Sequence, residues 1–281
     1  MIRRLLSINN QNNEPVHFDL RYLEGTNQAP VIILLHGFLG SKDWGFYPDL
    51  ARALVRSDYV TLAMNFSLNG IGPDGKNFTA MDAFARNTIS QELADVQAVV
   101  RAIREGKVGK QVIDPERIGL LGHSRGGGIA ILSALEMPEE IGALVTWATV
   151  SHFGRLSEEQ LAMLREQGFV EFDDASKKAT FRINQSFVDD LQDNEKKFNL
   201  VDRIEELEAP TLFIHGGADA VVPAAESEML YERCGAFSKR LEIIEDADHT
   251  FGTRHPFEVG TEAYNIARDL TESWFDRHLK Y

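Results

Sequence analysis

The sequence predicts an α/β protein with a doubly wound, mostly parallel sheet. Short apolar runs rich in β-branched residues alternate with longer segments whose apolar residues recur at helical spacing. This alternation is typical of consecutive βαβ units, which place helices on both faces of a parallel sheet. Several of the apolar runs end directly in glycine-containing turns, as buried strands commonly do.

The predicted strands are short and apolar on both faces. In chain order they cover Val31–Leu35, Tyr59–Met64, Arg117–Leu121, Ala143–Trp147, Thr211–Ile214 and Leu241–Ile244, the fourth and sixth having weaker signals. The first twenty or so residues, including His17–Tyr22, instead alternate polar and apolar residues as a half-exposed strand would, so we expect an antiparallel edge to the sheet there.

The predicted helices lie between these strands and have apolar residues at helical spacing. They cover Tyr47–Arg56, Ile89–Arg104, Gly128–Leu135, Ala224–Arg233 and Glu262–His278. The stretch from about Phe153 to Glu208 breaks the rhythm, because it is charged, shows no buried strand and exceeds an ordinary connection. We expect residues 1–281 to form one domain with a helical lid insertion over about 153–208; a solvated helical decoration is the alternative.

Composition and charge narrow the possible partners. The formal net charge of −14 disfavours nucleic acids and anionic membrane surfaces, which a polyanion repels. We expect a small-molecule substrate, and no pattern indicates an oligomeric state. The amino-terminal apolar stretch is too short for a signal peptide, and we find no run of about 20 apolar residues that could span a membrane. Cys234 is a single cysteine, so we expect a cytoplasmic protein.

Ser124 is the candidate nucleophile, in the run Gly122-His123-Ser124-Arg125-Gly126. The Gly-x-Ser-x-Gly motif alone is a modest signal, but here it follows a predicted strand and precedes a predicted helix, as a nucleophile elbow requires. A serine in such a turn has strained backbone angles. We expect that a Cβ at position 122 or 126 would collide with the neighbouring strand or helix.

A serine hydroxyl needs a neighbouring base and a carboxylate that orients that base. In this arrangement the chain order is serine, acid, histidine. Asp219 follows the predicted strand that ends at Ile214, and His249 follows the last predicted strand. Both would lie at the carboxyl edge of the sheet, where ligands of open α/β sheets bind. The predicted catalytic residues are therefore Ser124, Asp219 and His249.

Other residues could fill these roles. Asp246 and Asp248 could orient His249, but residues so near in sequence rarely reach the far ring nitrogen, so we place them on the loop surface. Three further histidines are interpreted as structural: His255, His215 and His123. His152 lies at the end of a predicted strand, where facing the substrate or solvent is equally consistent with the sequence.

Two backbone N–H groups are candidates for an oxyanion hole, where each donor typically contributes ~3 kcal/mol. They belong to Arg125, immediately after the nucleophile, and to Phe38 in the loop after the first buried strand. Trp147 and His152 are the candidates to line the substrate pocket. The histidine spacing fits no metal site, and the loop at Phe38 lacks a nucleotide-binding glycine fingerprint, so we expect neither metal nor cofactor.

The chain resembles the α/β-hydrolase superfamily, and within it the small bacterial carboxylesterases of the cinnamoyl/feruloyl esterase and acyl-peptidase-like group. The matching pieces are His36–Gly40, Asn65–Gly72, Gly122–Gly127, His215–Pro223 and Ala247–Phe251. They span most of the chain in the family's order. The resemblance implies a lid after the strand that ends near Ala148 and a pocket shaped by that lid.

The leading hypothesis is a serine esterase that cleaves short-chain or aromatic acyl esters through an acyl-enzyme intermediate. A serine peptidase or aminoacyl-peptide hydrolase with the same triad is the first alternative, although only about 30 residues precede the first buried strand, too few for the β-propeller of prolyl-oligopeptidase relatives. A non-catalytic binding protein of this fold is the second. Related dehalogenases, epoxide hydrolases and dienelactone hydrolases use aspartate or cysteine at the elbow, whereas position 124 is serine.

Overall fold

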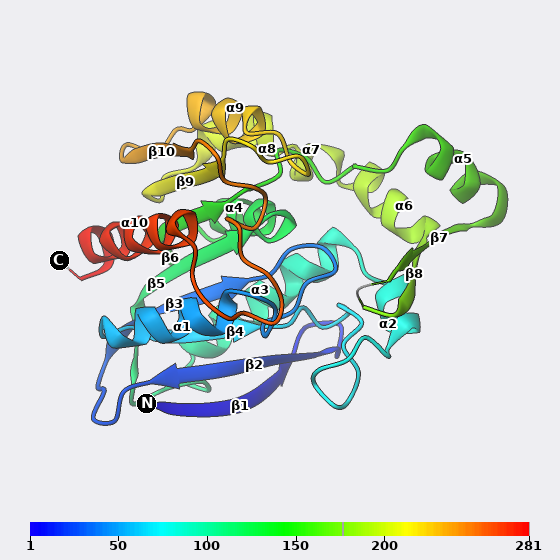
Figure 1. Ribbon diagram of the computed structural model, residues 1–281. Helices are drawn as coiled ribbons and strands as arrows, with labels where there is room; N and C mark the ends of the chain where they lie inside the picture. Colours follow the sequence, from blue (N-terminus) through cyan, green and yellow to red (C-terminus); the bar gives the residue numbers. More distant parts are fainter. Residues whose placement is uncertain (176, 281) are drawn as a thin grey trace.

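The computed structural model describes residues 1–175 and 177–280, which form an eight-stranded sheet with helices on both faces (Figure 1). The spatial order of the strands is β1-β2-β4-β3-β5-β6-β9-β10. Their bounds are β1 Ile2–Asn9, β2 Pro15–Tyr22, β3 Ala29–Leu35, β4 Val60–Met64, β5 Ile113–His123, β6 Ile141–Trp147, β9 Thr211–Gly216 and β10 Lys239–Ile244. From β4 to β10 all neighbouring strands are parallel. The predicted doubly wound, mostly parallel sheet is therefore confirmed.

The amino-terminal part of the sheet is antiparallel, as predicted. His17–Tyr22 belongs to β2, which lies between β1 and β4 and pairs antiparallel with both. The edge strand is β1 instead, whose residues Ile2–Asn9 pair with Tyr22–Pro15. Because β1 covers that side, most of β2 from Phe18 onward is buried. The first 22 residues therefore form the antiparallel edge that the sequence predicts, as two strands of which only β1 is half-exposed.

Alternate residues of the central strands pack against different helices, which produces two cores. Ile32 and Leu34 of β3 join the core beneath α1 (Tyr47–Arg56) and α10 (Glu262–Leu279). Val31, Ile33 and Leu35 join the core beneath α3 (Ile89–Arg104), α4 (Arg125–Glu136) and α9 (Ala225–Arg233). Within the described residues, no helix combines the length and the apolar character that crossing a membrane requires.

The segment between β6 and β9 projects from the sheet (Figure 1) and contains helices and a β-hairpin. In chain order it comprises α5 Glu158–Gln167, β7 Phe169–Asp174, β8 Ala179–Asn184, α6 Gln185–Asp193, α7 Glu195–Phe198, α8 Leu200–Arg203 and a 3-10 turn at Ile204–Glu206. The prediction of a helical segment missed the hairpin. The strands of the hairpin are short, and polar residues alternate with apolar ones in them, unlike in the apolar runs of the main sheet.

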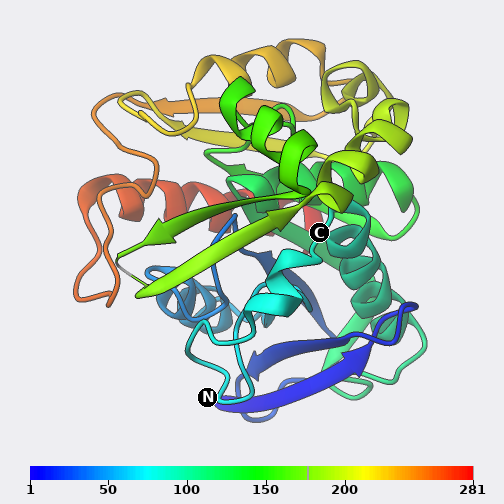
Figure 2. The same cartoon turned by 90° about the vertical axis from the view of Figure 1, so that its right-hand side faces the viewer.

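Aromatic contacts hold this projecting segment at two places, one against the body and one within the segment itself. Phe181 of β8 packs on Phe84 of the short helix α2 (Met81–Ala85), with ring centroids 4.8 Å apart. Figure 2 shows the hairpin beside α2. At the base, Phe153 contacts Phe198, with ring centroids 6.1 Å apart. The two ends of the projecting segment therefore meet at one point.

Candidate active site

Ser124 lies in the sharp turn between β5 and α4. Its backbone has φ 57° and ψ −124°, a conformation that non-glycine residues rarely adopt. Hydrogen bonds hold the turn: the Ser124 N–H donates to the Trp147 carbonyl at 2.9 Å, and the Gly127 N–H donates to the Ser124 carbonyl at 2.9 Å. The sequence therefore folds here into a strained turn that lifts the Ser124 side chain off the end of the sheet.

The glycines on either side of Ser124 have the predicted steric reason. A Cβ placed on Gly122 would lie 2.0 Å from the carbonyl oxygen of Gly126. A Cβ on Gly126 would lie 2.5 Å from the carbonyl oxygens of Leu35 and His36 at the end of the neighbouring strand. The expected collisions with helix and strand are confirmed.

Asp219 and His249 are in direct contact. Asp219 follows β9 and His249 follows β10, and the His249 Nδ1 lies 2.7 Å from the Asp219 Oδ2. The Asp219 Oδ1 accepts hydrogen bonds from the backbone N–H groups of Val221 and Val222, at 2.8 and 2.9 Å. Burial alone would raise the pKa of Asp219, but hydrogen bonds from His215, His249 and Val222 hold it well below its usual value. Asp219 is therefore ionised, and it can orient the His249 ring through Nδ1.

His249 is held next to the elbow by His123, the residue before Ser124. The His123 Nε2 donates a hydrogen bond to the His249 carbonyl at 2.8 Å, and the two ring centroids are 4.7 Å apart. Burial lowers the pKa of His123 to about 3, so this ring is neutral. Sequence reasoning treated His123 as structural, and its hydrogen bond is what joins the His249 loop to the elbow.

The loop that contains Phe38 passes directly over Ser124. A Cβ built on Gly37 would lie 3.0 Å from the Cβ of Ser124. His36 secures this loop: its Nδ1 donates to the Gly37 carbonyl at 2.8 Å, and its Nε2 accepts from the N–H groups of Phe66 and the Asn69 side chain, both at 3.2 Å. Burial lowers the pKa of His36 to about 4, which keeps the ring neutral and able to do both.

The backbone N–H groups of Phe38 and Arg125 are free to donate. Neither has a hydrogen-bond acceptor among residues 1–175 and 177–280. Arg125 is also the first residue of α4, where backbone N–H groups have no partner within the helix and the dipole favours negative charge. The structure thus places two unused donors near Ser124, as an oxyanion would require.

The rival residues have other partners. Asp248 is exposed and accepts hydrogen bonds from the Thr250 and Gly252 N–H groups, so it shapes the loop. The exposed side chain of Asp246 has no hydrogen bond or ion pair among the described residues. His255 accepts a hydrogen bond from the Gly45 N–H and stacks on Trp44. His215 is buried, bonded to Ser227 and Val222, and its Nε2 lies 3.2 Å from the Asp219 Oδ2.

A cavity of about 270 Å³ opens beside Ser124. Most of its lining is apolar, and none of the described lining residues is acidic. The lining comprises Phe38, Ser124, Arg125, Val150, Phe153, Arg155, Leu156, Gln160, Phe172, Ile183, Phe187, Val221 and Val222. Phe172, Ile183 and Phe187 come from the hairpin and from α6, so the projecting segment forms one wall.

Trp147 and His152 do not line this cavity. Trp147 is fully buried, packs against Phe46 and Phe251, and donates its indole N–H to Thr271 at 2.9 Å. Its expected place in the pocket was wrong because β6 turns this side chain into the core beneath α1 and α10. The His152 side chain is 57% exposed and lies beside Ser151 and Glu226. It faces solvent on the outside of the loop.

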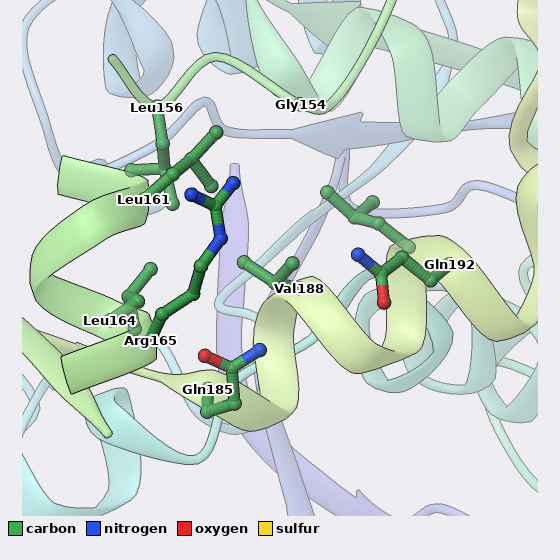
Figure 3. Close-up of a pocket in the computed structure, with 9 residues that line it drawn as sticks. Gly154, Leu156, Leu161, Leu164, Arg165, Gln185, Val188 and Gln192 are labelled. Atoms are coloured by element: carbon green, nitrogen blue, oxygen red, sulfur yellow. The ribbon is translucent and has the colours of Figure 1, made fainter. Parts of the chain in front are cut away.

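A larger cavity of about 450 Å³ lies within the projecting segment, between α5 and α6 (Figure 3). Leucines and Val188 form much of its wall, and Arg165 reaches across it from α5. Of the residues that line it, only Leu156 also lines the cavity beside Ser124. It holds none of the predicted catalytic residues, so its size does not make it the reaction site.

Sequence reasoning missed three supports of the site. His36 and Asn69 fix the loop over Ser124, and the family pieces His36–Gly40 and Asn65–Gly72 were the available signal. Glu92 on α3 lies under the Arg125 side chain, at 3.5 Å from its Nη1. No spacing pattern could have found it, because the two residues lie 33 positions apart on different helices.

Comparisons with known proteins agree with this fold. The family model described as the alpha/beta hydrolase fold matches residues 30–181, and a second model, described as a serine aminopeptidase, matches residues 162–252. A curated relative from Bacillus subtilis, "Putative esterase YitV", is 25% identical over 255 residues, which cover 87% of this chain and 93% of the relative.

Two solved structures share the fold over nearly the whole chain. Est1E from Butyrivibrio proteoclasticus, solved with ferulic acid bound, has a TM-score of 0.74 at 18% identity and covers 98% of this chain and 100% of its own. A dienelactone hydrolase from Anabaena variabilis has a TM-score of 0.66 at 20% identity, with 99% and 98% covered.

Proposed function

Because the chain belongs to the alpha/beta hydrolase fold family, we propose that it is a serine hydrolase of carboxylic esters, with Ser124, His249 and Asp219 as its catalytic triad. The observation that carries the proposal is the 2.7 Å contact between Asp219 and His249, on a loop tied by His123 to the elbow of Ser124. The esterase-like relatives support the same reaction class.

The proposed reaction has two halves. His249 takes the proton of the Ser124 hydroxyl as the Ser124 Oγ attacks the ester carbonyl, and the resulting oxyanion is stabilised by the N–H groups of Phe38 and Arg125. His249 then gives its proton to the departing alcohol, which leaves an acyl-enzyme. Water repeats the sequence and releases the acid. Asp219 stays ionised and holds the His249 ring, and no cofactor takes part.

The lining of the cavity beside Ser124 suggests the acyl group. Phe38, Phe153, Phe172 and Phe187 make it largely apolar, so short-chain or aromatic acyl groups fit its chemistry. Its volume of about 270 Å³ is near the small end for ligand sites. The segment of about 153–208 would act as the lid over this cavity, in a single-domain cytoplasmic enzyme that acts on small molecules and binds neither nucleic acid nor membrane.

An aminopeptidase is the second candidate, because the serine aminopeptidase model matches residues 162–252. Such an enzyme must bind a free α-ammonium group, for which an acidic side chain is the natural partner. The cavity beside Ser124 presents two arginines, and none of its described lining residues is acidic. The cavity therefore favours the ester reaction.

The test compares p-nitrophenyl esters of increasing chain length, methyl ferulate and an aminoacyl anilide. We expect the wild-type protein to cleave at least one ester faster than the anilide. Ser124→Ala and His249→Ala should each lower kcat by a factor of about 10⁴ or more and abolish labelling of Ser124 by a fluorophosphonate probe.

The exposed Arg182→Gln variant serves as the control, because Arg182 pairs with Glu171 away from both cavities. Unchanged labelling in either catalytic variant would overturn the triad. Faster cleavage of the anilide than of every ester would replace the esterase with the aminopeptidase.

A further inference from the structure

The Arg125 side chain lies at the wall of the cavity beside Ser124, where water hardly reaches it. Its side chain is 14% exposed, yet it carries a guanidinium group that must keep its charge. The backbone of this residue belongs to the proposed oxyanion hole, but the side chain has no part in the chemistry described above. A buried charge is costly unless it is well paired, so its partners matter.

The pairing of Arg125 within the protein is incomplete. Its one acidic partner among the described residues is Glu92, with 3.5 Å between Arg125 Nη1 and Glu92 Oε1, a long contact for a charged pair. The same Oε1 also accepts a hydrogen bond from the Asn87 side chain at 2.7 Å. In the described part of the chain, the buried Oε2 of Glu92 and the Nε and Nη2 of Arg125 have no partner.

Two aromatic rings of the cavity wall pack against the guanidinium. Its central carbon lies 4.2 Å from the ring centroid of Phe38 and 5.3 Å from that of Phe187. Such cation–π contacts leave the edge of the planar group free to bind an anion in two-point fashion. Arg155, the other arginine of the cavity, is different because it pairs with Glu226 at 2.8 Å.

We infer that Arg125 determines specificity by binding an anionic group, a carboxylate, on the acyl part of the substrate. The preferred esters are then those of dicarboxylic acids with one free carboxylate, whose apolar chain contacts Phe38 and Phe187. This inference rests on the proposed esterase function and names its substrate class. Arg125 pairs only loosely with Glu92, so its Nε and Nη2 remain available for the substrate carboxylate.

Substitutions of Arg125 and of Glu92 should have opposite effects on the preference for an anionic ester. The esters to compare are p-nitrophenyl hydrogen glutarate and p-nitrophenyl valerate, which have equal acyl chain length and differ in the terminal carboxylate. The measured quantity is the ratio of kcat/KM for the anionic ester to that for the neutral one. Arg125→Gln should lower this ratio about tenfold or more, the size expected for a charged hydrogen bond. Glu92→Gln should raise it about threefold, because it removes the competing carboxylate.

Arg182→Gln is the matched control, since it removes the same charge outside the cavity, and its ratio should stay within about twofold of the wild type. If Arg125 had a merely structural role, Arg125→Gln would lower kcat/KM for both esters alike, and Glu92→Gln would leave the ratio unchanged. Either result would overturn the inference, as would a fall in the ratio of Glu92→Gln. Glu92→Gln alone decides the matter if Arg125→Gln does not fold.

A binding measurement separates this inference from the proposed reaction. Calorimetry with Ser124→Ala should show tighter binding of monomethyl glutarate than of methyl valerate, and the double variant Ser124→Ala/Arg125→Gln should lose that preference. Absence of any preference in Ser124→Ala would refute the anion site even in an active esterase. If Ser124→Ala binds monomethyl glutarate preferentially but the wild-type protein hydrolyses no ester, the result would count against the proposed esterase reaction and not against the anion site.

Discussion

Ser124 occupies a backbone conformation that costs on the order of 1–3 kcal/mol for a residue with a side chain. Surrounding contacts must hold such a residue in place, and here they come from the hydrogen bond to Trp147 and from the close approach of Gly122 to Gly126. Backbone groups therefore hold Ser124 in its strained conformation, and the glycines at 122 and 126 let β5 and α4 approach closely enough to do so.

Alanine at Gly122 or Gly126 should break this arrangement. Either Cβ would lie within 2.5 Å of a backbone carbonyl oxygen, which cannot move without shifting β3 or α4. We expect a loss of about 2 kcal/mol or more in the free energy of unfolding, measured by urea denaturation, together with loss of esterase activity.

Gly154→Ala is the control, since its Cβ would meet nothing closer than a Leu191 carbon at 3.7 Å. That variant should unfold within about 0.5 kcal/mol of the wild type. Wild-type stability and activity in Gly122→Ala would show that the turn can relax.

At the scale of elements, the hairpin β7–β8 depends on one aromatic cluster. Phe181 is fully buried and contacts Phe84, Phe78 and Phe172. Phe181→Ala removes packing of about 3–5 kcal/mol, and the loss should fall mainly on the hairpin because it forms a separate two-stranded sheet. We expect proteases to cleave within residues 169–184 much faster, and KM to rise because Phe172 lines the cavity.

A matched comparison is Phe213→Ala, whose ring is equally buried in the core beneath α3 and α4. That change should lower the thermal midpoint of the whole protein more than Phe181→Ala does. Equal midpoints and unchanged cleavage of the hairpin would show that the hairpin unfolds only with the main sheet.

The main sheet was predictable because its strands have a strong local signal. Strands β3, β4, β6 and β9 are buried on both faces almost throughout, and the helices α1 and α3 match the predicted bounds. The hairpin was not predictable in this way. Its strands have one polar face and gain stability from distant aromatic residues on α2, which no local pattern reveals.

The residues of the candidate site likewise differ in how well the sequence predicted them. Ser124 and Asp219 each follow a strong strand and His249 follows a weaker one, and chain order together with these strand ends was enough to propose them. The side chains that shape the cavity, such as Ile183 and Phe187, lie on the weakly patterned segment. Trp147 lies at the end of a strand, near where the candidate catalytic residues lie, but its side chain points into the core, and the prediction did not separate the two faces of the strand.

At the scale of the whole molecule, Asp95 on α3 links three regions. Its carboxylate accepts hydrogen bonds from Asn10 between β1 and β2, at 2.6 Å, and from the Ser67 N–H after β4, at 2.7 Å. Burial, with a smaller contribution from Glu92, raises the pKa of Asp95 to about 7 despite these bonds. The unfolded chain has the ordinary value of 3.8.

The raised pKa makes stability depend on pH in a defined direction. Between pH 4 and 7 the folded protein holds a proton on Asp95 that the unfolded chain has lost, so stability from this group falls as pH rises through 7 and is level above it. In Asp95→Asn this component disappears. We expect the free energy of unfolding in urea to fall between pH 5 and pH 8 by at least about 1 kcal/mol more in the wild type than in Asp95→Asn.

The comparison uses the difference between the two proteins at each pH, because other groups titrate in both. Asn keeps the size of the side chain but loses one acceptor, so the variant is expected to be less stable overall. Parallel curves across this range would mean that Asp95 titrates as an ordinary exposed carboxylate.

The contact between Phe153 and Phe198 has an evolutionary consequence. It brings residues 153 and 198 together at the base of the projecting segment, so the residues between them form a closed loop. Lengthening such a loop costs little, since the closure entropy grows only with the logarithm of its length. A recombined stretch of residues 154–197 must also keep the contacts of Phe181 with Phe84 and of Asp190 with Ser90, so we expect new substrate ranges from sequences that vary the cavity wall and keep these contacts.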